Sequence, residues 1–233
     1  MSDTEADIPQ RPERIWLLRH AETATPTVFH GAESDIGLSE LGFRQAEVGA
    51  EWFRPLKPTL VISSAMTRAI STASPIARLC QTPHLVETDL HERQVGALCG
   101  TSFSLAQGPW AETVAKWSAG ETSYTTPGAE SYDDLSTRLL TAWNRILSSQ
   151  TTGRIVIVAH GVVCKVLLLS LLQGWGPRGW VELGRVANYA VSELVPTPQG
   201  WHAQTLLTVP PPVAALSDGR PTGVGIPPLK SEA

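Results

Sequence analysis

The chain has 233 residues, of which 42% are hydrophobic and 17% charged, enough apolar material for one large buried core. Its formal charge of −4 gives no basic surface for a nucleic-acid partner. No apolar run approaches the ~18 residues of a membrane-spanning helix, so we expect no membrane association either.

The first residues and the cysteines favour a reducing compartment. Residues 1–13 are acidic and polar with two prolines, unlike the basic and then apolar layout of a signal peptide, and we expect them to be disordered. Cys80, Cys99 and Cys164 are odd in number and form no CxxC pair. They predict buried free thiols, and hence a cytoplasmic protein.

The first half of the chain alternates short apolar runs with amphipathic segments. Ser39 and Glu40 are typical of the start of a helix, and the prolines and glycines of residues 22–37 are typical of a loop. The patterns predict strands over 15–18, 59–62 and 84–88 and helices over 39–53 and 66–79.

The second half continues the alternation. Ser131 with Asp134 three residues later resembles a capping box, and it opens a helix with Leu135, Leu139 and Ile146 on one face. We predict a strand over 154–159, a core helix over 162–172 and strands over 190–195 and 201–207. Residues 101–128 are harder to assign, with a helix near 110–117.

The chain therefore predicts one domain over residues 14–208, followed by a proline-rich, disordered tail over 209–233. Strands that alternate with helices predict an α/β fold, with a mostly parallel central sheet covered on both faces. The oligomeric state stays open.

Cations and imidazoles follow three of the predicted strands. Arg19 and His20 end the first strand, Arg68 lies in the first turn after the second, and His160 ends the strand over 154–159. If these strands run parallel, the four side chains meet where ligands bind in open α/β sheets. Because gathered cations repel one another without an anion, a phosphoryl group fits best. We expect neither a metal nor a cofactor, since no carboxylate cluster or HExxH pattern is present.

Six motifs in the same order resemble the histidine phosphatase superfamily, also called the phosphoglycerate mutase-like family. They are Arg19-His20-Ala21-Glu22-Thr23, Leu38-Ser39-x-x-Gly42-x-x-Gln45-Ala46, Ser63-Ser64-x-x-x-x-Arg68-Ala69-x-x-Thr72-Ala73, Leu90-x-Glu92 with Gly96 and Gly100, Gly128-Ala129-Glu130-Ser131, and Ala159-His160-Gly161. The likeness covers roughly residues 14–195. It implies a three-layer α/β/α, phosphoglycerate mutase-like fold.

The resemblance also implies a role for each matching residue. His20 matches the nucleophile that becomes a phosphohistidine, and Glu92 matches the acid that protonates the leaving oxygen. Arg19, Arg68 and His160 match the clamp around the phosphoryl group. The Thr23 hydroxyl and the Gly161 N–H are further candidate phosphate donors.

Two positions depart from the family's pattern. Ala21 replaces the usual glycine, which is tolerable if its φ is negative. Pro26 replaces an asparagine that touches the phosphoryl group in many members, and proline has no donor to replace it.

The leading hypothesis is a metal-independent phosphomonoesterase that acts on a small phosphate ester. The cofactor-dependent phosphoglycerate mutases of the family carry a much longer, basic insert before the segment matching Gly128, whereas this short insert offers Lys116 as its cation. A mutase must also shield its phosphoenzyme from water. A mutase is the runner-up, and a non-catalytic protein that binds a phosphorylated ligand is the second alternative.

Overall fold

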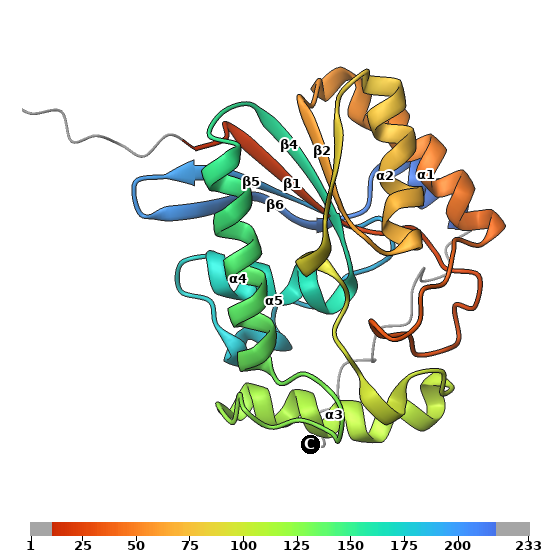
Figure 1. The fold of residues 1–233 in the computed structure, drawn as a ribbon, viewed down its shortest axis with the longest axis vertical. Coiled ribbons are helices and arrows are strands. Elements are labelled where there is room, and N and C mark those ends of the chain that lie inside the picture. The colour runs from red at the N-terminus through yellow and green to blue at the C-terminus, as the bar shows by residue number, and fades with distance from the viewer. Residues whose placement is uncertain (1–10, 218–233) are drawn as a thin grey trace, which may run out of the picture.

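A computed structural model describes residues 11–217 of the chain. Six strands form one sheet in the order β3-β2-β4-β1-β5-β6 (Figure 1). Their bounds are β1 Arg14–Arg19, β2 Leu60–Ser64, β3 His84–Glu87, β4 Arg154–Ala159, β5 Val191–Thr197 and β6 Gly200–Thr208. Strands β1 to β4 run parallel, and the β5–β6 hairpin pairs antiparallel with β1, so the predicted, mostly parallel sheet is confirmed.

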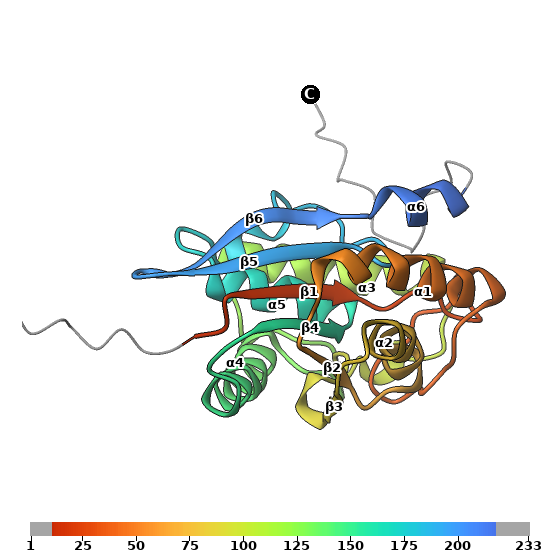
Figure 2. The same cartoon turned by 90° about the horizontal axis from the view of Figure 1, so that it is seen from above.

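Helices cover both faces of the sheet, as Figure 2 shows. The α-helices are α1 Glu40–Phe53, α2 Thr67–Cys80, α3 Phe103–Ala119, α4 Tyr132–Ser149, α5 Gly161–Leu171 and α6 Pro211–Ala214. Short 3-10 helices occupy Arg54–Leu56, Thr88–Leu90, Gly96–Leu98, Pro177–Trp180 and Ala215–Ser217. The expected three-layer α/β/α architecture is confirmed.

Successive residues of the strands point to opposite faces of the sheet and pack into two separate hydrophobic cores. Ile15 and Leu17 of β1 pack in the larger core with the apolar sides of α3, α4 and α5. Trp16 and Leu18 point to the other face and pack with α1, α2 and α6. A strand buried on both faces is apolar throughout, which is why β1 and β4 were predictable from their sequences.

Helix α3 is longer than the sequence predicts. It begins at Phe103, whereas the pattern indicated a helix only near 110–117. Gly108 and Pro109 concealed its first turns, because proline removes a helical N–H and usually marks a break. Here the carbonyl that loses this partner belongs to Leu105, which is 71% exposed, so water can hydrate it.

The two ends of the predicted domain also differ from expectation where the structure describes them. Glu13 N donates to Gly153 O, so residues 11–13 lie against the fold. Helix α6 follows β6 inside the segment predicted as a disordered tail, and its Val213 is 1% exposed. Proline at the first helical position already has the φ angle that a helix needs. Residues 1–10 and 218–233 lie outside the described part.

The parallel strands place their carboxyl ends together. Figure 1 shows the carboxyl ends of β1, β2 and β4 at one edge of the sheet. His20 follows β1, Arg68 lies in the first turn of α2 after β2, and His160 follows β4. A search of the described residues finds no helix with the length and hydropathy needed to cross a membrane.

Helix α1 packs so closely on Tyr189 that a side chain at Gly49 has no room. A Cβ added to Gly49 would lie 2.1 Å from Cζ of the buried Tyr189. We expect Gly49→Ala to lower the free energy of unfolding by about 1–3 kcal/mol through overpacking. Arg44→Ala, on the exposed side of the same helix, should stay within about 0.5 kcal/mol of the wild type. Urea denaturation measures both, and equal stabilities would contradict this packing.

Candidate active site

One cavity of about 370 Å³ lies at the carboxyl ends of the parallel strands. Its floor carries the basic residues that the sequence singled out. The predicted site residues that line it are Arg19, His20, Thr23, Arg68, Glu92 and Gly161. His160 lies directly behind them, with its ring centroid 5.2 Å from that of His20.

The ring of His20 is held in one tautomer. Its Nδ1 lies 2.7 Å from the carbonyl oxygen of Ala21, which can only accept, so Nδ1 carries the proton. Nε2 therefore keeps its lone pair. Burial lowers the pKa of His20 well below 6.5, and the nearby charges of Arg19 and Arg68 lower it further. The site thus presents a neutral imidazole nitrogen as a candidate nucleophile.

His160 supports the arginine beside it. Arg68 Nε donates to its Nδ1 at 3.2 Å, so the proton of the neutral ring is on Nε2, which donates to Ser64 Oγ at 2.9 Å. Both ring nitrogens are therefore bonded to protein groups. Burial, followed by the charge of Arg68, lowers the pKa of His160 well below 6.5.

Two guanidinium groups, one buried and one part-buried, carry positive charge at the cavity floor. Arg68 is 1% exposed, and its Nη1 and Nη2 donate to the carbonyl oxygens of Ser34 and Gly31. Arg19 donates from Nη1 to Val186 O at 2.6 Å, while its Nε is buried without a partner among the described residues. Burial lowers the pKa of Arg19 to about 10, so it stays protonated at neutral pH. Such cations need an anion at the cavity floor.

The carboxyl group of Glu92 lies at the beginning of α5. Its Oε2 accepts from Val162 N at 3.3 Å and its Oε1 from Arg93 N at 2.9 Å. Glu92 is 7% exposed and lines the cavity, as does a second carboxylate residue, Glu22. Glu92 is therefore placed to exchange a proton with a group bound above His20.

The two departures from the family pattern have clear positions. Ala21 is not among the non-glycine residues with positive φ, and its buried N–H donates to Thr72 Oγ1. Its methyl group is therefore accommodated without strain. Pro26 lines the cavity, where it contributes apolar surface and no donor.

Aromatic side chains make the wall of the cavity. Helix α3 contributes Phe103 and Trp110, which meet Phe29 with ring centroids 5.4 and 6.0 Å apart. Lys116 lies outside this wall and pairs with Glu121 at 3.0 Å. Arg93, a second cation between Glu92 and Gly128 that the sequence analysis left out, is fully buried between the rings of Trp110 and Trp117.

Two further cations that line the cavity escaped the sequence analysis. Lys165 of α5 is 8% exposed, donates to Gly184 O and lies 4.8 Å from the ring centroid of Trp180. Burial lowers its pKa to about 8. In the sequence, Lys165 could have been noticed as a charged residue within a mostly apolar helix. Arg185 lies in an irregular loop that no pattern distinguished, and its Nε and Nη2 have no partner among the described residues.

Within residues 11–217, no group of three or more histidine, cysteine, aspartate or glutamate side chains is arranged to hold a metal ion. The positive charge at the cavity floor comes from Arg19 and Arg68.

The family model described as "Histidine phosphatase superfamily (branch 1)" matches residues 15–208. The chain is 31% identical over 193 residues to the metal-independent phosphoserine phosphatase of Arabidopsis thaliana, covering 80% of this chain and 78% of that protein. It is 34% identical over 158 residues to phosphoglycerate mutase-like protein 4 of the same plant, covering 66% and 68%.

The chain also resembles a solved phosphatase structure. The mycobacterial glucosyl-3-phosphoglycerate phosphatase in complex with VO3 superposes with a TM-score of 0.73 at 26% identity. The match covers 84% of this chain and 99% of that one.

The buried histidines should remain uncharged in mildly acidic solution. Their folded-state pKa values lie well below the 6.5 of an unfolded chain, so the NMR ring signals of His20 and His160 should have titration midpoints below 6.5. Their contribution to stability is present above pH ~6.5 and declines as the pH falls toward the folded values. His20→Gln and His160→Gln assign the signals. A titration midpoint at or above 6.5 for either ring would contradict this electrostatic picture.

Proposed function

Because the chain belongs to the histidine phosphatase superfamily, we propose that it is a metal-independent phosphomonoesterase working through a phosphohistidine on His20. The observation that carries this proposal is the unprotonated Nε2 of His20, which lines the same cavity as the guanidinium groups of Arg19 and Arg68. Phosphoryl transfer needs a positioned nucleophile and neutralisation of the equatorial oxygens, and these groups supply both.

In the first step, His20 Nε2 attacks phosphorus and the bond to the ester oxygen breaks. Glu92 donates a proton to that oxygen, so the product leaves as an alcohol. Arg19 and Arg68 hold the phosphoryl oxygens throughout, with Thr23 Oγ1 and the Gly161 N–H as additional donors.

In the second step, water attacks the phosphohistidine and Glu92 accepts its proton. The phosphorus–nitrogen bond breaks, which releases inorganic phosphate and restores His20. His160 keeps Arg68 in place through Nδ1. A direct bond from His160 to the phosphoryl group needs a second ring proton, which the negative charge of the substrate favours.

The composition of helix α3, which forms part of the cavity wall, favours hydrolysis over mutase activity. Helix α3 lines the cavity with Phe103, Trp110, Ala111 and Val114, and so contributes no cation for a second phosphate. The runner-up is nevertheless supported by Lys165 and Arg185, which line the cavity from another side. A non-catalytic binding protein is less well supported, since His20, Glu92 and His160 are all present.

The volume of the cavity supports a small phosphorylated substrate. For location we propose the cytoplasm, because Cys80, Cys99 and Cys164 are all free thiols. Cys164 is buried as expected, whereas Cys80 and Cys99 are only half-buried.

Substitution of the nucleophile tests the covalent step. His20→Ala should abolish hydrolysis of 4-nitrophenyl phosphate in EDTA, since no other group can form the phosphoenzyme. Rapid acid quenching of the wild type followed by mass spectrometry should find an acid-labile phosphate on His20. His202→Ala, an exposed histidine outside the cavity, serves as the control. Near wild-type activity of His20→Ala would remove the assignment.

The products distinguish a phosphatase from a mutase. With 3-phosphoglycerate as substrate and 2,3-bisphosphoglycerate added, inorganic phosphate should be the main product, because α3 lines the cavity with apolar residues and offers no cation to retain a bisphosphate. Phosphorus NMR measures both products in one sample. Accumulation of 2-phosphoglycerate that depends on the added bisphosphate would make the runner-up correct.

A further inference from the structure

Among the described residues, the carboxyl group of Glu92 is held by backbone groups. Its two oxygens accept from the main-chain N–H groups of Arg93 and Val162, and from no other group in that part of the chain. The residue lies in an irregular segment between the 3-10 helices Thr88–Leu90 and Gly96–Leu98. The position of the carboxyl group therefore depends on whatever fixes the backbone of residues 89–94.

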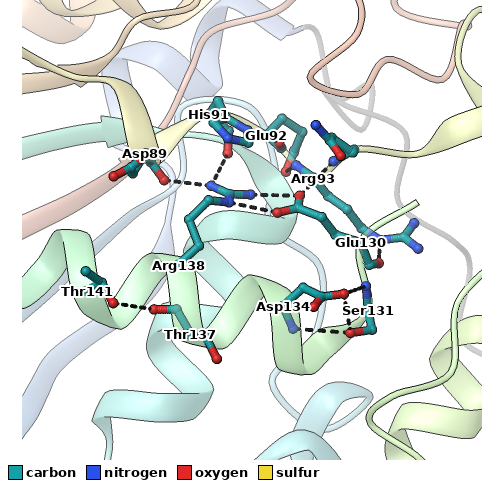
Figure 3. Close-up of polar contacts among 11 residues, drawn as sticks. Asp89, His91, Glu92, Arg93, Glu130, Ser131, Asp134, Thr137, Arg138 and Thr141 are labelled. Atoms are coloured by element: carbon teal, nitrogen blue, oxygen red, sulfur yellow. Dashed lines mark hydrogen bonds and ion pairs between the residues drawn. The ribbon is translucent and has the colours of Figure 1, made fainter. Parts of the chain in front are cut away.

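Arg138 of α4 fixes that backbone on the side before Glu92. Its Nη1 donates to Asp89 O at 2.6 Å and to His91 O at 3.0 Å (Figure 3). A single guanidinium nitrogen thus joins two backbone carbonyl groups of the segment, and one of them belongs to His91, the residue before Glu92. The Arg138 side chain is 15% exposed, so water competes little for these bonds.

Glu130 fixes the same segment on the side after Glu92. Both of its carboxyl oxygens accept from Arg138 at 2.8 Å, a bidentate pair that orients the guanidinium group. Oε2 also accepts from Gln94 N at 2.8 Å, and the Glu130 carbonyl accepts from Arg93 Nε at 2.8 Å. Figure 3 shows this pair beside the segment that carries Glu92.

The N-terminus of α4 gives the pair a fixed base. Ser131 caps the helix in a capping box with Asp134, directly after Glu130 and two turns before Arg138. The separation between Glu130 and Arg138 is thereby set by a capped helix. Glu130, Ser131, Asp134 and Arg138 are not among the residues that line the cavity.

We propose that Arg138 and Glu130 are positioning residues that set the Glu92 carboxyl group for proton transfer to the leaving oxygen. This inference rests on the proposed function, in which Glu92 is the general acid. It predicts that loss of the pair harms the reactions that need a proton donor and spares those that do not. A misplacement of about 1 Å costs up to roughly 100-fold in rate.

The test compares kcat/KM for an alkyl phosphate with that for 4-nitrophenyl phosphate, because kcat/KM includes the step that breaks the ester bond. Glu92→Gln provides the reference for losing the general acid, about 10²- to 10⁴-fold on the alkyl ester. Arg138→Gln should lower kcat/KM about 10- to 100-fold on the alkyl ester and less than about 3-fold on the aryl ester, which leaves without a proton. In the Glu92→Gln background, Arg138→Gln should have almost no further effect.

Arg145→Gln is the matched control. Arg145 lies on the same helix and pairs with the side chains of Glu87 and Asp89, but its side chain is 50% exposed and it contacts no backbone oxygen of residues 89–94. Both substrates should be cleaved by this variant at the wild-type rate. Thermal unfolding checks each variant, and Arg138→Lys and Glu130→Gln replace Arg138→Gln if it does not fold.

Equal losses on both substrates, or additive losses in the Glu92→Gln background, would overturn the positioning role while leaving the phosphatase assignment intact. A wild type that hydrolyses neither ester would instead remove the proposed function, and this inference with it.

Discussion

The buried guanidinium group of Arg68 holds the candidate site together. All three of its nitrogens donate to other parts of the chain, one to His160 and two to the Ser34 and Gly31 carbonyls of a single loop. The residue belongs to α2, so these bonds join a helix, the end of β4 and the loop that follows β1. A buried charge with this many fixed partners has few alternative positions, and the cavity floor is accordingly preorganised.

The cavity combines two environments that suit the two ends of a phosphate ester. Its floor offers fixed N–H donors and positive charge, whereas its wall is made of rings such as Phe29, Phe103 and Trp110. The apolar wall lowers the local dielectric constant and strengthens the interactions at the floor. Arg93 connects the two, because it follows Glu92 in the chain and stacks between two rings of α3.

Much of the fold and the floor of the site could be predicted because local patterns carry the information. Strand β4 is apolar from Ile155 to Ala159, Arg19 ends β1, and His20 and His160 directly follow strands. The elements that were not predicted depend on tertiary contacts. Helix α3 extends across Pro109 because it packs on the larger core, and α6 forms because Val213 packs in the second core. Arg185 was missed because only the folded chain brings its loop to the cavity.

The parts of the chain that shape the wall and those that form the floor come from different segments. Phe103, Trp110 and Val114 belong to α3, which lies in the chain between the Glu92 segment and α4. Arg19 ends β1, His20 follows it and Arg68 lies in the first turn of α2. Sequence drift in α3 would therefore reshape the space around the alcohol half of a substrate and leave the reacting centre as it is. Because the wall and the floor lie on different segments, substitutions in α3 can change which phosphate ester is accepted while the residues of the floor stay the same.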